Sequence, residues 1–249
     1  MTSQQCLWLP SPERFILDDD EVHVWRSNLN QAPSVIQALS EVLAPDERQR
    51  SGRFHFRKDH DQFIVGRAVL RQILSGYLKT LPERIRFSYG QYGKPALVEE
   101  RDYDSLSFNV SHSHGVALYA VARARRIGLD VELLREDIAT PTIAARFFSS
   151  KEVAALRALP SDQQTVAFFN CWTRKEAYIK ARGEGLSYPL QWFTVSLAPG
   201  ESASFLSTDG DSHETSGWSL VELSPGAGYV AALAVEGSAP RLRCWQWQA

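Results

Sequence analysis

The order of apolar and polar positions along the chain predicts alternating strands and helices. Ile127–Leu133, with the sequence IGLDVEL, alternates strictly between apolar and polar residues, which is typical of a strand with one buried face. Other apolar runs predict strands at Val22–Trp25, Ile85–Tyr89 and Leu190–Leu197, and hairpins at Leu106–Ser111 with Val116–Arg123 and Trp218–Leu223 with Tyr229–Val235. Helices are predicted over Pro33–Leu43, Pro45–Leu81, Ser149–Leu159 and Ser161–Arg182, with a break allowed in the two longest.

The same order of elements occurs twice. Each half contains a strand, two helical segments, a strand and a hairpin, and Val22 corresponds to Ile127 at the same separation as Ile85 to Leu190. Sequence identity between the halves is low, so the repeat is a hypothesis about structure. It predicts an α/β (α+β) fold of two similar lobes, residues 1–124 and residues 125–249. Clefts between such lobes are common places for a binding site.

Composition narrows the class of protein without naming a function. The chain has 249 residues, 44% hydrophobic and 22% charged, as in ordinary soluble globular proteins. A net charge of −2 gives no reason to expect a nucleic acid or a membrane surface as partner. No apolar run reaches the roughly 18 residues of a membrane span, and the first residues lack the basic start and apolar core of a signal peptide.

Three cysteines are widely spaced in the chain. Cys6, Cys171 and Cys244 form no CxxC pair, so we expect neither a zinc site nor a disulfide framework. Each is interpreted as a small hydrophobic residue, and a reducing cytoplasm fits this pattern.

Two carboxylates share one face of the predicted strand at Ile127–Leu133. Asp130 and Glu132 are two positions apart, so they project to the same side at a spacing of about 7 Å. Carboxylate oxygens suit a hard cation such as Mg²⁺, which proteins often hold together with substrate phosphates. The alternative is a solvated strand face. Gly128 beside the acids indicates a close approach by another group, such as a ligand.

A second charged pair lies in Trp172–Arg182, with the sequence WTRKEAYIKAR. On a helix, Glu176 and Lys180 are one turn apart on one face. This pair could hold a metal and a phosphate side by side, or it could be an ordinary surface ion pair. The pattern alone leaves both alternatives open.

Other polar residues suit phosphate or nucleotide binding. Ser111 and His112 are adjacent on a strand, so they point to opposite sides and do not form a nucleophile–base pair. Lys94 follows Gly93 in a turn and can reach an anion. Arginines at the spacing of one helix face suit a phosphate monoester, although interleaved acids also allow a solvated face: Arg50, Arg53 and Arg57.

Taken together, these segments resemble the 4'-phosphopantetheinyl transferases. The resemblance rests on GKP, FNVSHS, IGLDVEL, RFFSSKE and WTRKEAYIKARGEGLS, which begin at Gly93, Phe108, Ile127, Arg146 and Trp172. The chain is similar to the long monomeric type that activates peptide synthetases such as surfactin synthetase, and to cyanobacterial-type relatives. The resemblance implies two pseudo-twofold-related lobes with coenzyme A and Mg²⁺ between them. The enzyme would transfer the phosphopantetheine arm to a serine of an apo acyl or peptidyl carrier protein, releasing adenosine 3',5'-bisphosphate.

The resemblance also implies roles for individual residues. The metal carboxylates would be Asp130, Glu132 and Glu176, and the base would be Glu176, a metal-bound water or Glu152. Lys180 and Lys175 would contact phosphate oxygens. Coenzyme A contacts in the first lobe would come from Arg50, Lys94, Ser111 and His112, with His112 and Arg50 on the 3'-phosphate.

Some assignments depart from the family pattern or stay open. Glu47 falls where some members carry a lysine, so Arg48 or Arg53 would have to replace that basic residue. Glu152 fits equally well as a structural carboxylate at a helix terminus. The carrier would dock between Ala139 and Leu159, and it could serve fatty acid, polyketide or nonribosomal peptide synthesis. Two rival functions are a coenzyme A-binding protein that leaves the pyrophosphate intact and a scaffold for carrier proteins.

Overall fold

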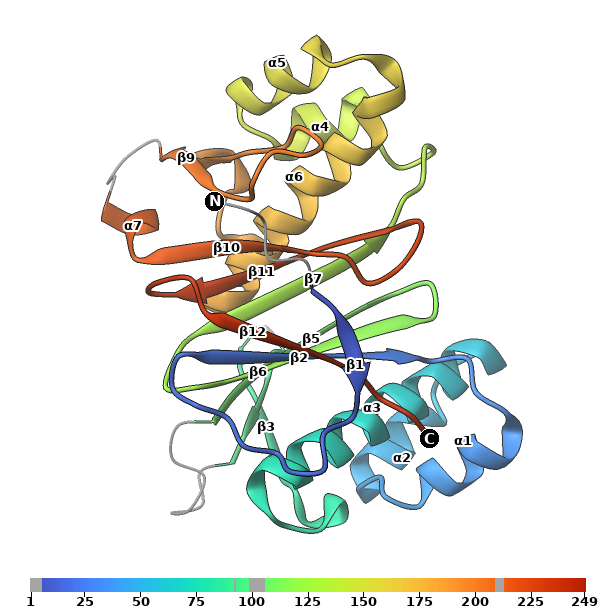
Figure 1. Ribbon diagram of the computed structural model, residues 1–249. Helices are drawn as coiled ribbons and strands as arrows, with labels where there is room; N and C mark the ends of the chain where they lie inside the picture. Colours follow the sequence, from blue (N-terminus) through green and yellow to red (C-terminus); the bar gives the residue numbers. More distant parts are fainter. Residues whose placement is uncertain (1–5, 92, 99–105, 209–212) are drawn as a thin grey trace.

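The computed structural model describes residues 6–91, 93–98, 106–208 and 213–249. Two β-sheets pack face to face, and helices cover the outer face of each sheet (Figure 1). The first half of the chain contributes β1 (Trp8–Pro10), β2 (Glu21–Asn28), α1 (Pro33–Ser40), α2 (Pro45–Ser51), α3 (Arg57–Leu78), a 3₁₀ turn (Pro82–Arg84), β3 (Phe87–Tyr89), β4 (Pro95–Leu97), β5 (Leu106–Ser113) and β6 (Val116–Arg123).

The second half repeats this order. It contains β7 (Ile127–Leu133), α4 (Pro141–Phe147), α5 (Ser150–Ala158), α6 (Ser161–Arg182), 3₁₀ turns at Gly185–Ser187 and Leu190–Trp192, β8 (Phe193–Val195), β9 (Phe205–Thr208), α7 (His213–Ser216), β10 (Trp218–Leu223), β11 (Tyr229–Glu236) and β12 (Arg241–Gln246). One sheet contains the run β2-β6-β5 and the other the run β7-β11-β10, so corresponding strands are neighbours in the same order. The predicted duplication and the α/β fold class are confirmed.

The last strand crosses from one half to the other. β12 pairs in parallel with β2, and β1 pairs in parallel with β12, so the larger sheet has the order β1-β12-β2-β6-β5. β12 therefore completes the sheet of the first half. The division into residues 1–124 and residues 125–249 stays a prediction.

The alternation in β7 follows from its place between two layers. Leu129 and Val131 point into the apolar layer between the sheets, where they meet residues such as Val24 and Leu118. The opposite face of β7 is turned to α6, and a Cβ on Gly128 would lie 2.0 Å from the carbonyl oxygen of Ala177. The glycine is required because a helix, rather than a ligand, approaches the strand at this point.

Most predicted elements are confirmed, with differences at their boundaries. The predicted helix Pro45–Leu81 is broken into α2 and α3, whereas α6 is uninterrupted from Ser161 to Arg182. The predicted strands at Ile85 and Leu190 begin later, at Phe87 and Phe193. Helix α4 was not predicted, and Thr140 caps it by accepting a hydrogen bond from the Ile143 amide.

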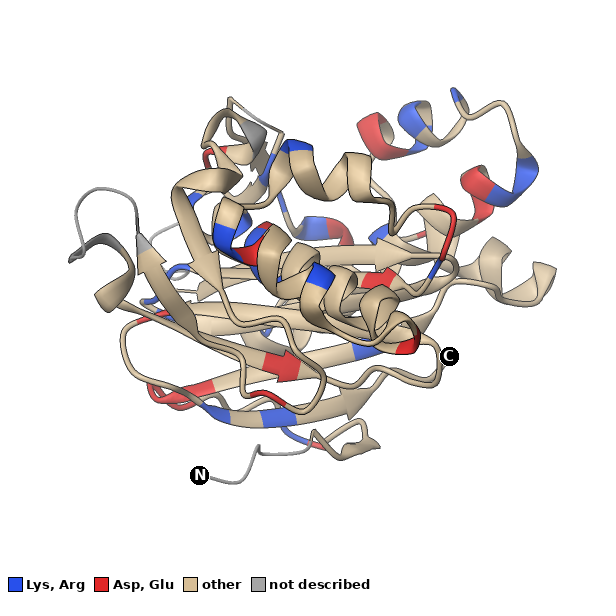
Figure 2. Cartoon of the chain, turned by 90° about the horizontal axis from the view of Figure 1, so that it is seen from above, with Lys and Arg blue, Asp and Glu red and all other residues tan. Residues whose placement is uncertain are grey.

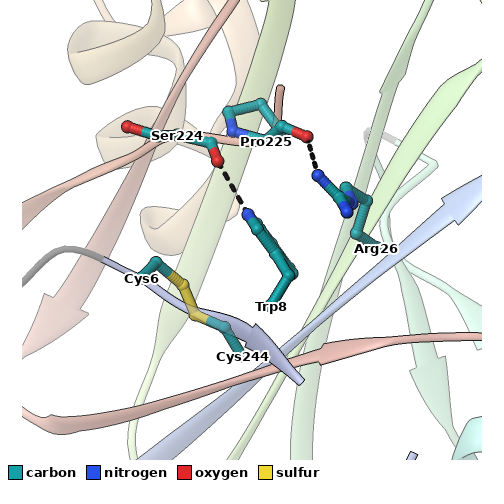
Figure 3. The surroundings of a disulfide bond; sticks show 6 residues. All are labelled: Cys6, Trp8, Arg26, Ser224, Pro225 and Cys244. Carbon is teal, nitrogen blue, oxygen red and sulfur yellow. Dashed lines mark hydrogen bonds between the residues drawn. A yellow bond between two sulfur atoms is a disulfide. The ribbon is translucent and has the colours of Figure 1, made fainter. Parts of the chain in front are cut away.

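A disulfide joins the two ends of the chain, so the prediction that the cysteines form no disulfide is wrong for this pair. Cys6 and Cys244 are bonded, with their Cα atoms 5.8 Å apart (Figure 3). Nothing in the sequence spacing indicates this pair, because the two residues become neighbours only when β1 pairs with β12. Cys171 is a buried free thiol, as expected of a small hydrophobic residue.

The residues around the disulfide connect the two sheets. Trp8 Nε1 donates to the carbonyl oxygen of Ser224, which follows β10, at 2.7 Å (Figure 3). The guanidinium of Arg26 lies over the Trp8 ring, 4.8 Å from its centroid, and donates to the carbonyl of Pro225. The disulfide therefore anchors a first strand that contacts both halves of the chain.

Acidic and basic segments are interspersed in the view of Figure 2, in keeping with the small net charge. In the part of the chain that the structure describes, we find no helix with the length and apolarity needed to cross a membrane.

Candidate functional site

The charged face of β7 meets the charged face of α6. Lys180 Nζ donates to Asp130 Oδ1 at 2.6 Å, and Ser111 Oγ on β5 donates to the same oxygen at 2.9 Å. Lys180 also donates to Ser111 Oγ at 3.1 Å. Three predicted site residues from three elements thus form one hydrogen-bonded cluster.

The ion-pair partner of Lys180 decides between the two interpretations of α6. In the described residues, Lys180 pairs with Asp130 on a neighbouring strand, not with Glu176 one turn away on its own helix. The surface ion-pair alternative is therefore wrong. The helix directs both of its charged side chains towards the acids of β7.

Negative charge exceeds positive charge in this cluster. Burial, followed by the charge of Asp130, raises the pKa of Glu176 from its ordinary 4.5 to about 7, and Lys180 offsets only part of this effect. The pKa of Glu132 is also raised, first by burial and then by Asp130. The carboxylates of Asp130, Glu132 and Glu176 are therefore close enough to interact electrostatically.

One carboxylate oxygen has an unmet hydrogen-bonding capacity. Asp130 Oδ2 is buried and has no hydrogen-bond partner among the residues that the structure describes. The three acids are not drawn together around one point: within the described ranges, no group of three His, Cys, Asp or Glu side chains is arranged to hold a metal ion. The cluster therefore offers oxygen donors and excess negative charge in an open arrangement.

Side chains of β5 bind the free edge of β7. Asn109 Oδ1, Ser111 Oγ and Ser113 Oγ accept from the amides 20 residues later, at 2.9, 3.3 and 3.2 Å: Leu129, Val131 and Leu133. Ser113 also donates to Glu132 Oε2 at 2.8 Å. Asn109 and Ser113 were not among the predicted site residues, although polar residues at every second position of FNVSHS were a visible signal.

Arg50 and His112 share a cavity on the other side of β5. It has a volume of about 530 Å³, lies between α2, α3 and the β5–β6 hairpin, and is also lined by Phe63, Arg67 and Tyr89. The Arg50 guanidinium stacks over Phe63, 5.4 Å from the ring centroid. The pKa of His112 is lowered, first by loss of water around the ring and then by Lys180, with Asp130 acting in the opposite direction.

Ser111 and His112 have different surroundings because adjacent residues point to opposite faces of the strand. Ser111 is buried against Asp130, whereas His112 lines the cavity. Ser111 was predicted to line the nucleotide pocket, but its hydroxyl contacts Asp130 of the acid cluster.

Lys94 has a structural role in this arrangement. Its ammonium donates to the carbonyl oxygens of Ile127 at 3.3 Å and Lys180 at 2.6 Å, which ties β7 to the end of α6. Burial, followed by the charge of Arg126, lowers its pKa to about 8. Lys94 lines a cavity of about 620 Å³ that adjoins the cavity of Arg50 and His112, because Tyr89 and Pro95 line both.

Lys175 and Glu152 do not reach the acid cluster. They form an ion pair of 2.9 Å in which both side chains are 0% exposed. Lys175 also donates to the carbonyls of Leu190 and Phe193, and Glu152 accepts from the amides of Ser149 and Val195. The expected phosphate contact and base role are corrected to a structural pair, because Lys175 lies about 100° around the helix from Glu176.

The expected basic face near Glu47 is also rearranged. Glu47 is buried and paired with Arg71 at 2.6 Å and Arg67 at 3.2 Å. Because α2 ends at Ser51 and α3 begins at Arg57, Arg53 lies in the turn between them and Arg50, Arg53 and Arg57 do not share one helix face. Arg48 donates to the carbonyl of Leu43 at 2.9 Å. Of Arg48, Arg50, Arg53 and Arg57, Arg50 lines the cavity.

Comparison with known proteins identifies a family for both halves of the chain. The "4'-phosphopantetheinyl transferase superfamily" matches residues 126–234, and "4'-phosphopantetheinyl transferase, N-terminal" matches residues 25–124. The chain is 40% identical to 4'-phosphopantetheinyl transferase HetI of Nostoc sp., over 98% of this chain and 99% of that protein. It is 35% identical to 4'-phosphopantetheinyl transferase Sfp of Bacillus subtilis, over 62% and 66% of the two chains. It is also 35% identical to 4'-phosphopantetheinyl transferase psf-1 of Bacillus pumilus, over 66% and 67%.

Proposed function

The chain belongs to the 4'-phosphopantetheinyl transferase superfamily, and we propose that it transfers the phosphopantetheine arm of coenzyme A to a serine of an apo carrier protein. The observation that carries the proposal is the meeting of β7 and α6. Their acids and Lys180 form one cluster, and Ser111 and His112 connect this cluster to the cavity of Arg50. Positioning and charge neutralisation are the main requirements of phosphoryl-type transfer.

The acid cluster fits a divalent cation such as Mg²⁺. It supplies carboxylate oxygens, the donors that Mg²⁺ prefers, and Asp130 Oδ2 has no partner among the described residues. Burial, followed by the charge of Asp130, raises the pKa values of Glu132 and Glu176, and a bound cation would offset the negative charge of these acids. We assign Asp130, Glu132 and Glu176 as the residues that would hold it. When bound, the cation would neutralise charge on the pyrophosphate of coenzyme A.

The serine hydroxyl of the carrier attacks the phosphorus that bears pantetheine. A bond forms between the serine oxygen and this phosphorus, and the bond from phosphorus to the bridging oxygen breaks. The bridging oxygen leaves with adenosine 3',5'-bisphosphate. We assign acceptance of the serine proton to Glu176, because a positioned carboxylate is a common general base.

Cationic groups hold the nucleotide part of coenzyme A. Lys180 lies between the acids and Ser111, where it can neutralise charge on the departing phosphate. We assign the 3'-phosphate to Arg50 and His112, which line one cavity. Arg67 and Tyr89 line the same cavity and are hydrogen-bonded to each other at 2.8 Å, so they are added to the predicted nucleotide pocket.

A direct experiment tests the transfer. The protein is incubated with an apo carrier protein, coenzyme A and Mg²⁺, and the carrier is weighed by mass spectrometry. We expect the mass gain of one phosphopantetheine arm and the appearance of adenosine 3',5'-bisphosphate. An unmodified carrier across acyl and peptidyl types, with coenzyme A bound, would instead support a coenzyme A-binding protein. Carrier binding without coenzyme A binding would support a scaffold.

The oligomeric state, the location and the pathway of the carrier remain predictions. A monomer follows from the two-lobe pseudo-dimer hypothesis and is tested by light scattering. A cytoplasmic location was inferred partly from the cysteines, and the Cys6–Cys244 disulfide removes that part of the argument. The carrier's pathway is tested by ranking kcat/KM over a panel of apo carriers.

A further inference from the structure

Ser113 and Glu132 come from different halves of the chain and share a hydrogen bond. Ser113 Oγ donates to Glu132 Oε2 at 2.8 Å and accepts from the Leu133 amide at 3.2 Å. The ring nitrogen Nδ1 of His114 lies 3.1 Å from the same hydroxyl. Ser113 is buried, and its hydroxyl lies between the Glu132 carboxylate, to which it donates, and the Leu133 amide, from which it accepts.

Glu132 needs an external group to fix its direction. A glutamate has several rotatable bonds, and Glu132 is only partly buried, so its carboxylate would otherwise sample several positions. The Ser113 hydroxyl holds one of its oxygens, just as the Ser111 hydroxyl holds one oxygen of Asp130. Each serine also binds the β7 amide next to the acid that it holds.

We infer that Ser113 is a positioning residue that fixes Glu132 for divalent-cation binding across the contact between β5 and β7. This inference rests on the proposed function, because it assigns Ser113 a task in the same cation site. Ser113 acts through Glu132 and makes no contact of its own with the reacting groups. A hydrogen-bond partner behind a metal ligand typically changes metal affinity by 10–100-fold when it is removed.

Asn109 provides a matched control on the same strand. It lies on the same face of β5, is buried, and accepts from the Leu129 amide at 2.9 Å. Among the residues that the structure describes, Asn109 bonds to no carboxylate. Asn109→Ala and Ser113→Ala therefore both leave one β7 amide without its partner, but only Ser113→Ala releases an acid.

The experiment compares wild type, Ser113→Ala, Ser113→Thr and Asn109→Ala in MgCl₂ titrations. One readout is the rise in Tm that Mg²⁺ causes without coenzyme A, and the other is the Mg²⁺ concentration that half-saturates carrier modification. We expect Ser113→Ala to need about 10-fold more Mg²⁺ in both assays, while its KM for coenzyme A at saturating Mg²⁺ is unchanged. Ser113→Thr keeps the hydroxyl and should return towards wild type. Asn109→Ala should lower Tm but keep the wild-type Mg²⁺ requirement.

Two results would overturn the assignment. One is a wild-type Mg²⁺ requirement in Ser113→Ala, and the other is an equal increase in Asn109→Ala, which would trace the effect to loosening of the β5–β7 contact. If Ser113→Ala does not fold, Ser113→Cys keeps the volume, weakens the hydrogen bond and should shift the requirement in the same direction. A wild-type protein that shows neither a Mg²⁺-dependent Tm nor carrier modification would refute the proposed function itself.

Discussion

Glu47 and Glu152 occupy corresponding places in the two halves of the chain and make the same contacts. Each lies in the first turn of a helix, α2 or α5, and accepts a hydrogen bond from the backbone amide three residues earlier. The donor is Ala44 at 2.9 Å in one case and Ser149 at 2.7 Å in the other. Each acid therefore caps the N-terminus of its helix.

The cations that pair with these acids also correspond. Arg71 comes from the long helix α3 and Lys175 from the long helix α6, and each is almost completely buried beside its acid. Each cation also donates to two carbonyls in the segment after its long helix: Pro82 and Ile85 for Arg71, and Leu190 and Phe193 for Lys175. The two buried ion pairs, Glu47–Arg71 and Glu152–Lys175, therefore have the same structural role. This role explains why Glu47 is an acid and why Glu152 is not free for catalysis.

Glu152→Gln tests whether the buried Glu152–Lys175 ion pair is structural. The amide side chain would leave Lys175 buried without a countercharge, and breaking such a pair typically costs about 3–5 kcal/mol. We expect that loss in the free energy of unfolding, measured by urea denaturation. The rate of carrier modification per folded molecule should stay near wild type at low temperature. A large loss of kcat in fully folded Glu152→Gln would restore the base assignment.

The two ion pairs also show how much of the fold and of the site could be predicted from the sequence. The duplication was visible because strand and helix periodicity are local and survive when identity between the halves is low. The acids of β7 and the charged pair of α6 were found for the same reason. Lys175 and Glu152 were wrongly predicted as a phosphate contact and a base because they lie in family motifs. A motif does not indicate which side of a helix is buried. The Cys6–Cys244 pair depends on β1 pairing with β12 across nearly the whole chain, which no local pattern indicates.

Glu176 should make the metal-free protein less stable at high pH. Its pKa is about 7 in the folded state against an ordinary 4.5, so the folded state binds more protons between these values. Stability therefore falls as pH rises from about 4.5 to 7, and the loss remains above pH 7. Glu176→Gln removes this charge, and we expect the metal-free variant to be about 2 kcal/mol more stable than wild type at pH 8 once screening at this partly exposed site is allowed for.

The control for Glu176 is the same comparison at low pH and with metal. At pH 4.5 the two metal-free proteins should unfold at nearly the same denaturant concentration, because half or more of the carboxyl is protonated in both states. Added Mg²⁺ should raise the Tm of wild type more at pH 8 than at pH 6, since protons compete for the carboxylates. Carrier modification by Glu176→Gln should be abolished. A variant with no stability gain at pH 8 would show that Glu176 is not under electrostatic strain.

His112→Ala should weaken binding of coenzyme A more than binding of dephospho-coenzyme A. His112 lines the cavity that also contains Arg50, and only coenzyme A carries the 3'-phosphate assigned to them. Loss of one hydrogen bond to a charged group costs about 1.5–3 kcal/mol, which corresponds to roughly a 10–100-fold rise in the dissociation constant. Calorimetric titration with the two nucleotides measures the difference. Equal losses for both would move His112 away from the 3'-phosphate.

Reduction of the Cys6–Cys244 disulfide should lower stability and leave catalysis intact. The bond closes nearly the entire chain into a loop, and removal of a native disulfide typically costs about 2–5 kcal/mol. Activity should persist because β1 and β12 lie at one edge of the larger sheet, whereas β5 and the acid cluster lie at the other.

Cys6→Ser should match the reduced wild type in urea denaturation and should no longer respond to reductant. Thiol titration of the unfolded protein without reductant should find one free thiol, Cys171, in wild type. Three free thiols there would show that the bond does not form, and a fall in kcat on reduction of a folded sample would show that this edge communicates with the site.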